Sequence, residues 1–149
     1  MSTPGFSRAE LEQVELALSS TPRTVRFQDV DAAGTVYYAR VFEYFGDAYV
    51  ALLERGGVDL RDMIAAGEVL APLVHAEADY LSPLRFGDAI TVEVAMTRVG
   101  GSSITVGYRI LSGSRLCAIG HTVHVFVDAK TFGKREVPAA IRSAMNRLG

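Results

Sequence analysis

Apolar side chains recur at helical spacing in the first half of this chain. From Val41 to Leu53 they fall three or four positions apart, which predicts an amphipathic helix. Val25 and Phe27 alternate with polar neighbours just before it, so we expect a strand, then a loop, then this helix. Gly56-Gly57 marks the helix end, and residues 59–67 predict a short helical or irregular connection.

The rest of the chain alternates apolar and polar residues, which is the pattern of strands. The first such run places His75, Glu77 and Asp79 on one face. Gly100-Gly101 separates the next two runs and predicts a hairpin. We predict strands over 73–81, 90–96, 104–110 and 116–128, followed by an amphipathic helix that opens at Pro138.

A short helix is expected near the amino terminus, because Ser7 and Glu10 have the spacing of a capping box. Leu11 and Val14 then supply apolar surface with which this helix can dock. We therefore expect residues 1–22 to form a helical appendage and residues 23–149 to form a single domain.

The order of these elements is helix, strand, long helix, four consecutive strands and helix. Such an order favours an α+β fold with an antiparallel sheet over alternating βαβ units. The one long apolar helix must lie against that sheet to bury its apolar face. We therefore predict the hotdog fold, in which a curved antiparallel sheet wraps around one long central helix.

Composition excludes several classes of protein. The 149 residues are 49% hydrophobic and 21% charged, with a net charge of −2, so a disordered chain or a nucleic-acid binder is not indicated. The lone cysteine, Cys117, cannot form an intramolecular disulfide, and we expect it to be a buried inert thiol. We find no signal peptide, transit peptide or membrane span, and expect a cytoplasmic protein.

The loop before the long helix carries the most promising chemistry. It holds Asp29, Asp31 and Gly34, and it ends where unpaired N–H groups and the positive end of the helix dipole can polarise a carbonyl. An anion beside such a helix start suggests acyl transfer. Alternatively, both acids are ordinary turn residues, and Asp29 has the stronger claim to a structural role. Gly34 supplies either a special backbone conformation or close substrate approach.

The run Asp-x-Asp-x-x-Gly-x-Val-Tyr, at residues 29–37, resembles the 4-hydroxybenzoyl-CoA thioesterase group of hotdog thioesterases. The resemblance covers roughly residues 24–138. It continues through Pro-Leu-Val-His at 72–75, Tyr-Leu-Ser-Pro-Leu at 80–84, Phe-Gly-Asp at 86–88 and Val-Phe-Val-Asp at 125–128. The segments 31–34 and 72–75 are most similar to the 1,4-dihydroxy-2-naphthoyl-CoA hydrolases of quinone biosynthesis.

The resemblance implies specific roles within the loop and helix. Asp31 matches the catalytic carboxylate, acting as nucleophile or as general base on water. Tyr38 matches the residue whose backbone N–H binds the thioester oxygen. Asp47 matches an acidic helix position that orients the site or meets a substrate hydroxyl, although a solvated or capping acid is the alternative.

The same resemblance implies hydrolysis of an aromatic or bulky acyl-CoA, with 1,4-dihydroxy-2-naphthoyl-CoA as the preferred candidate, and no metal or bound cofactor. It also implies a homodimer with active sites at the interface, paired into a tetramer. The hairpin loop 98–103 lacks the family's cluster of bases, so Lys134 and Arg135 are further candidates for phosphate contacts. The predicted substrate contacts are Gly34, Val36, Tyr37, Asp47, His75, Arg98, Ser102 and Lys130.

Three other interpretations remain open from the residues alone. A hotdog hydratase needs a histidine and an acid near a helix start, but His75, His121 and His124 are poorly placed for this. A thioesterase that acts on carrier-protein or aliphatic substrates also fits the loop. So does a non-catalytic module that binds acyl-CoA. His121 and His124 fall on opposite faces of a strand and no histidine has a ligand partner at a recognised spacing, so we expect no metal site.

Overall fold

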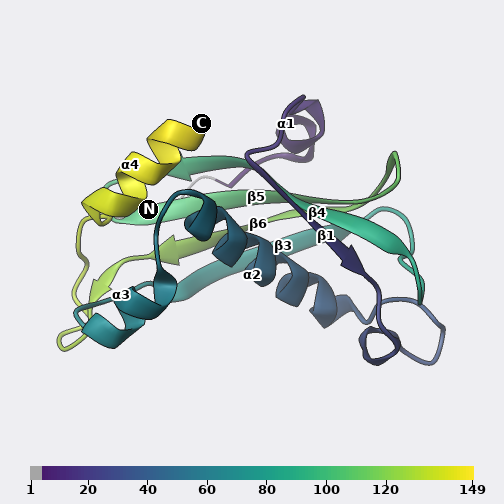
Figure 1. Cartoon of the computed structure of the whole chain (residues 1–149), viewed down its shortest axis with the longest axis horizontal. Helices are drawn as coiled ribbons and strands as arrows, with labels where there is room; N and C mark the ends of the chain where they lie inside the picture. Colours follow the sequence, from purple (N-terminus) through teal and green to yellow (C-terminus); the bar gives the residue numbers. More distant parts are fainter. Residues whose placement is uncertain (1–4) are drawn as a thin grey trace.

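The computed structural model describes residues 5–149, and its main feature is an antiparallel sheet crossed by one long helix (Figure 1). The sheet has five strands in the order β1-β4-β5-β6-β3. All neighbouring strands are antiparallel, which confirms the predicted α+β hotdog architecture. The strands are β1 (Ser19–Thr24), β3 (Leu73–Tyr80), β4 (Ala89–Val99), β5 (Ser103–Ser112) and β6 (Arg115–Val125).

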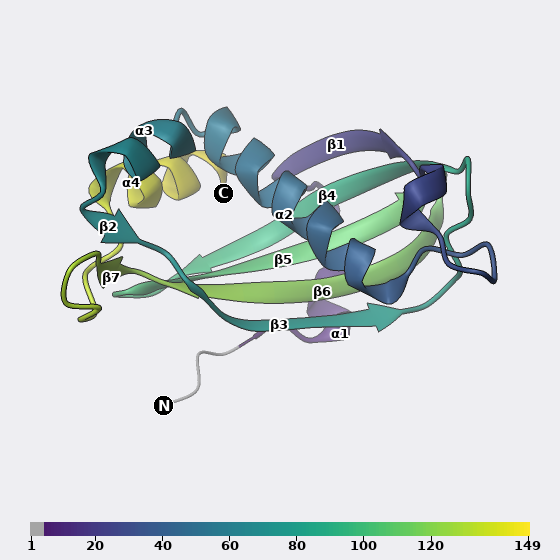
Figure 2. The same ribbon diagram turned by 90° about the horizontal axis from the view of Figure 1, so that it is seen from below.

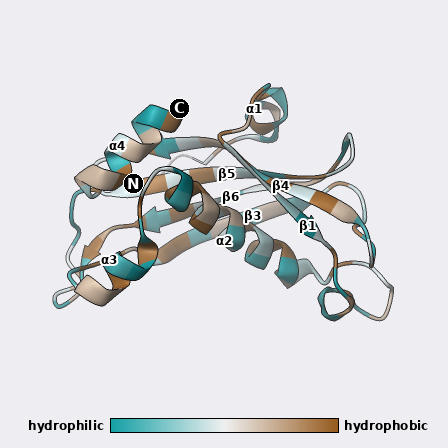
Figure 3. Cartoon of the chain, viewed as in Figure 1, coloured by the Kyte–Doolittle hydropathy of each residue, from teal (hydrophilic) through white to brown (hydrophobic). Residues whose placement is uncertain are grey.

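The long helix α2 (Tyr38–Arg55) lies across one face of the sheet, as Figure 2 shows. Figure 3 colours the residues of α2 by hydropathy and shows hydrophilic and hydrophobic residues alternating along the helix, as expected of an amphipathic helix. Phe45 is fully buried and its ring stacks on Tyr108 of β5 with centroids 4.4 Å apart. Burying such a side chain stabilises the fold by about 1.5–3 kcal/mol. The helix ends at Gly56, where the sequence predicts its end.

Short elements gather at the end of the sheet where α2 finishes, which we call the α4 end (Figure 1). The predicted connection forms a helix that is capped by Asp59 and ends at Gly67 in a left-handed conformation. Pro138 caps the terminal helix, as predicted. These elements are α3 (Leu60–Ala66), β2 (Val69–Leu70), β7 (Val127–Asp128) and α4 (Ala139–Leu148), with β2 and β7 forming a separate antiparallel pair.

The other face of the sheet, here called the outer face, carries α1 (Arg8–Gln13) (Figure 2). The predicted capping box of Ser7 and Glu10 is present. Phe6 and Leu11 are buried against the sheet, and a Cβ at Gly107 would collide with both. Strand β1 begins at residue 19, so the boundary expected after residue 22 falls inside a strand of the sheet.

Strand β3 forms one edge of the sheet and pairs only with β6 within the part of the chain that is described. Leu73, Val74 and Tyr80 on this strand are each at least half exposed. An edge strand presents unpaired backbone groups, which makes β3 suited to pairing with another chain. None of the described helices combines the length and apolar character needed to cross a membrane.

Candidate active site

A tight turn holds Asp31 between the 3-10 helix η1 (Phe27–Asp29) and α2. The turn closes because the Asp31 N–H donates to the Thr35 carbonyl and the Gly34 N–H donates to the Asp31 carbonyl, both at 2.9 Å. Gly34 has φ of +77°, and a Cβ there would meet nothing within 4 Å. The glycine therefore serves the backbone conformation of the turn and not a close contact within this chain.

The Asp31 side chain is exposed and makes one hydrogen bond within the described chain. Its Oδ1 accepts from the Ala33 N–H at 2.9 Å, an arrangement that fixes the carboxylate over the turn. The second oxygen accepts no hydrogen bond from the described residues. A carboxylate held in this way is able to attack a carbonyl or to take a proton from water.

The first turn of α2 supplies the complementary group. Tyr37 caps the helix without a side-chain hydrogen bond, and its own N–H donates to the Asp29 carbonyl at 2.9 Å. The next donor, the Tyr38 N–H, has no partner among residues 5–149. An unpaired N–H at the positive end of the helix dipole can stabilise developing negative charge on an oxygen.

Asp29 is the structural acid of the pair, as the sequence favoured. It is fully buried, and it accepts hydrogen bonds from the Arg26 N–H at 3.0 Å and the Tyr44 hydroxyl at 2.9 Å. Burial acts to raise the pKa of Asp29, but the hydrogen bonds from Arg26 and Tyr44 outweigh it and the pKa is lowered overall. Asp29 therefore stays ionised and ties η1 to α2.

A hollow of about 240 Å³ opens beside the start of α2. Val36, one of the predicted substrate contacts, lines it together with Leu84 and Cys117. Cys117 is buried, as expected. The structure adds Tyr80 to the residues near the site. Its hydroxyl donates a hydrogen bond to the Tyr38 carbonyl at 2.7 Å. The sequence motif at 80–84 does not by itself predict that Tyr80 lies there. The feature of the sequence that could have indicated Tyr80 is a tyrosine, with its polar hydroxyl, at the end of a predicted strand.

Three predicted substrate contacts lie away from this loop. Asp47 forms an ion pair with Arg23 of β1. Arg98 lies on the outer face, where its guanidinium donates to the Gly5 carbonyl at 3.3 Å and covers the Phe6 ring. His75 is the third, and it also lies on the outer face.

Ser102 and Lys130 occupy the α4 end of the sheet. The Ser102 carbonyl accepts from the Phe126 N–H at 2.8 Å, and the Lys130 N–H donates to Asp128 Oδ1 at 2.9 Å. Strand β4 begins beside the loop that holds Asp31 and ends at residue 99, at the α4 end. Within one chain, the whole length of β4 therefore separates Ser102 and Lys130 from Asp31.

The three histidines are not part of the loop site. His124 lies on the α2 face, where its ring stacks on Tyr49 at 4.5 Å. His121 lies on the outer face against Phe6, so the two histidines do point to opposite faces. Strand pairing places His75 beside His121, with ring centroids 5.3 Å apart, which spacing along the sequence could not show.

Several known proteins are similar to this chain in sequence and in fold. A family model described as Thioesterase-like superfamily matches residues 25–145. The 1,4-dihydroxy-2-naphthoyl-CoA hydrolase of Nostoc punctiforme is 36% identical over 119 residues, covering 80% of each chain. A solved 1,4-dihydroxy-2-naphthoyl-CoA thioesterase from Synechocystis has a TM-score of 0.82 at 27% identity, covering 87% of this chain and 96% of that one. A solved Pseudomonas aeruginosa protein has a TM-score of 0.79 at 31% identity, covering 91% and 94%.

Proposed function

This chain belongs to the Thioesterase-like superfamily and is a thioester hydrolase, and we propose that it hydrolyses 1,4-dihydroxy-2-naphthoyl-CoA to the free acid and CoA. The observation that carries the site assignment is the unpaired Tyr38 N–H directly after the turn that holds Asp31. The names of the relatives from Nostoc punctiforme and Synechocystis support the choice of acyl group.

The proposed reaction uses two groups of the chain. The thioester oxygen accepts a hydrogen bond from the Tyr38 N–H, which favours negative charge on that oxygen as the carbonyl is attacked. Asp31 either removes a proton from the attacking water or attacks the carbonyl carbon itself, giving an anhydride that water then hydrolyses. In both routes the C–S bond breaks, CoA leaves as a thiolate that takes up a proton, and the acid is released.

Aromatic side chains near the loop support an aryl acyl group. Tyr37 and Tyr38 are 46% and 62% exposed and their ring centroids are 4.8 Å apart. Phe27 and Phe86 form a second exposed pair, with centroids 6.0 Å apart. A flat naphthoyl group can stack on such rings, whereas a flexible aliphatic chain gains less from them.

A twofold dimer through β3 would complete the site. Strand β3 runs from the α4 end toward the Asp31 loop, where Tyr80 meets Tyr38. If two β3 edges pair antiparallel, the α4 end of one copy comes next to the Asp31 loop of the other. The partner's Ser102 and the partner's Lys130, which a single chain keeps far from Asp31, would then approach the CoA portion of the substrate.

The proposal is tested by measuring thiol release from four thioesters with the wild-type protein: 1,4-dihydroxy-2-naphthoyl-CoA, 4-hydroxybenzoyl-CoA, benzoyl-CoA and octanoyl-CoA. We expect kcat/KM to be highest for the hydroxynaphthoyl thioester, by at least about tenfold over benzoyl-CoA, because a site matched to the larger ring and its hydroxyl groups discriminates at this level. Equal or higher kcat/KM for octanoyl-CoA would overturn the proposed acyl group. Absence of turnover with all four would overturn the site assignment.

A further inference from the structure

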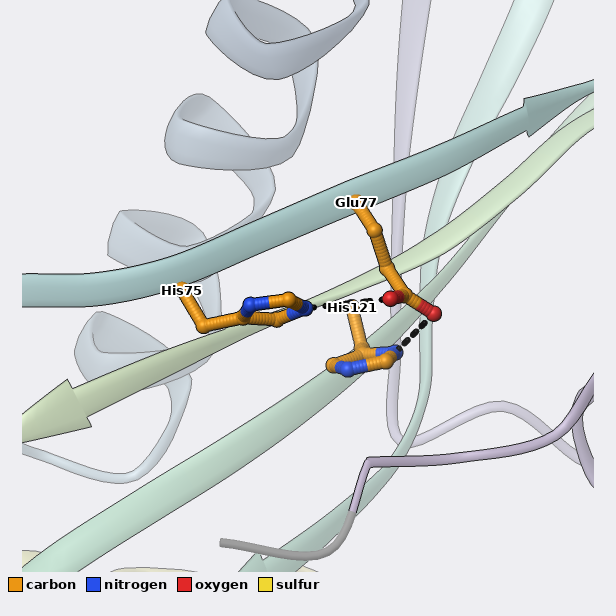
Figure 4. Close-up of side chains that lie close together, drawn as sticks. All are labelled: His75, Glu77 and His121. Carbon is orange, nitrogen blue, oxygen red and sulfur yellow. Dashed lines mark hydrogen bonds and ion pairs between the residues drawn. The ribbon is translucent and has the colours of Figure 1, made fainter. Parts of the chain in front are cut away.

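Two imidazoles and a carboxylate meet on the outer face of the sheet, as Figure 4 shows. His75 and Glu77 are two residues apart on β3, so their side chains leave the strand on the same side. His121 of β6 lies directly opposite Glu77 in the strand register. The Glu77 carboxylate reaches one nitrogen of each ring, with Oε2 3.0 Å from His75 Nε2 and Oε1 3.3 Å from His121 Nδ1.

The spacing of these atoms matches the requirements of a metal ion. One ligand atom from each of the three residues lies within 4.8 Å of the other two. A tetrahedral zinc ion with bonds of about 2.0–2.1 Å holds its ligand atoms roughly 3.3 Å apart, close to the separations around Glu77. Two histidines and one glutamate also form a donor set that zinc accepts with a fourth position left open.

The environment of His121 is a second, independent indication of a metal site. The residue is 4% exposed, and its Nδ1 is buried without a hydrogen bond among the described residues, since the 3.3 Å contact with Glu77 is not aligned as one. A buried imidazole nitrogen without a partner is costly, and it points at the other two groups. Gly5 lies against Nε2 of the same ring, so Nδ1 is the nitrogen that faces the cluster.

We propose that His75, Glu77 and His121 bind one divalent transition-metal ion of the zinc class on the outer face of the sheet. The fourth position opens toward a hollow of about 670 Å³, which Phe6 and Lys134 also line. The ion joins edge strand β3 to β6 beside residues 5–7. It lies on the face opposite α2, so it takes no part in the chemistry at Asp31 (Figure 4).

Dimer formation through β3 is compatible with this site. Edge pairing uses backbone groups in the plane of the sheet, whereas His75 and Glu77 project from its outer face. The proposal does not depend on the substrate of the thioesterase.

Titration of the untagged, chelator-stripped protein with zinc chloride in a non-coordinating buffer tests the site by calorimetry. We expect one ion per chain. His75→Gln and Glu77→Gln each remove a ligand from an exposed position and should weaken binding by at least about tenfold, since even the loss of a residue that merely supports a ligand costs that much. Asp79→Asn is the matched control, because Asp79 is an exposed acid on the same strand and face but outside the cluster.

Circular dichroism of each variant confirms that it is folded, and cobalt(II) absorption reports the ligands directly. Saturable binding that both ligand substitutions weaken and Asp79→Asn preserves supports the site. No saturable binding by the wild type, unchanged affinity in both ligand variants, or equal weakening by Asp79→Asn would overturn it. A cobalt–thiolate absorption band would also overturn it, because it would assign the metal to Cys117.

Discussion

A single residue separates Asp29 from Asp31, yet only Asp29 is buried. The backbone N–H of Arg26 and the hydroxyl of Tyr44 satisfy Asp29, whereas Asp31 has one local bond to Ala33 and an open oxygen. This difference in environment gives Asp29 a structural role and supports the proposal that Asp31 is the catalytic carboxylate. Sequence spacing favoured this division but could not show it, because Tyr44 reaches Asp29 only after α2 has folded against the loop.

Asp29→Asn should lower the free energy of unfolding at neutral pH by about 1.5–3 kcal/mol, because hydrogen bonds to an ionised acceptor are lost from a buried place. The lowered pKa of Asp29 means that its ionisation stabilises the fold above the ordinary value of about 3.9. That stabilisation disappears as the pH falls through the lower folded-state pKa. Chemical denaturation at neutral and acidic pH should thus show the gap between wild type and variant narrowing in acid.

Asp31→Asn is the matched control for this stability measurement, since it makes the same change at an exposed position. It should alter the free energy of unfolding by no more than about 0.5 kcal/mol. Equal stability of Asp29→Asn and wild type at neutral pH, or a gap that widens in acid, would contradict the structural role of Asp29.

At the level of elements, periodicity predicted α2, the central strands and the β4–β5 hairpin, because each buries a regular apolar face. The first strand was placed too late, since residues 19–24 form a largely polar edge strand that contains Pro22. The grouping of His75 with His121 could not be predicted, because it depends on the register between β3 and β6. Gly5 and Phe6 beside this cluster contact His121 of β6, and such a tertiary contact has no signal in the local sequence pattern.

The start of α2 gives a prediction at the same scale. Tyr38 is the first residue of the helix, a position that tolerates proline, and Tyr37 has φ of −61° and ψ of 132°, which suit the residue before a proline. Tyr38→Pro therefore removes the N–H donor while keeping the helix. We expect kcat to fall about 10²–10³-fold, as when an oxyanion donor is lost elsewhere.

Tyr38→Ala separates the backbone from the side chain in this experiment, because alanine lacks the ring but retains the N–H. Circular dichroism should give the same helix content for both variants. If Tyr38→Pro turns over substrate as fast as Tyr38→Ala, the Tyr38 N–H does not bind the thioester oxygen.

At the scale of the whole molecule, the predicted residues separate into two groups. The proposed catalytic residues Asp31 and Tyr38 lie with Val36 at the loop beside α2, whereas Ser102 and Lys130 lie at the α4 end of the sheet. The antiparallel dimer through β3 that we propose would bring the two groups together across the subunit boundary. Light scattering should then give at least twice the chain mass of 16.1 kDa.

Mixing two impaired variants tests this shared site. Asp31→Asn lacks the proposed catalytic carboxylate, and Lys130→Glu should repel the CoA phosphates, so each variant alone should be weakly active. After the two are unfolded and refolded together, half of the dimers contain both chains and one of their two sites is intact, so activity should rise to roughly a quarter of wild type. No recovery in the mixture would show that both residues act within one chain, and full activity of Lys130→Glu alone would remove Lys130 from the CoA contacts.

The central claim is that Asp31 performs thioester hydrolysis at the start of α2. We would test it by comparing the turnover of 1,4-dihydroxy-2-naphthoyl-CoA by wild type and Asp31→Asn, with binding of the intact thioester measured in parallel. Glu15→Gln, which changes an exposed acid in the amino-terminal segment, is the control. Loss of turnover with retained binding in Asp31→Asn alone is the predicted result, and undiminished turnover by folded Asp31→Asn would contradict it.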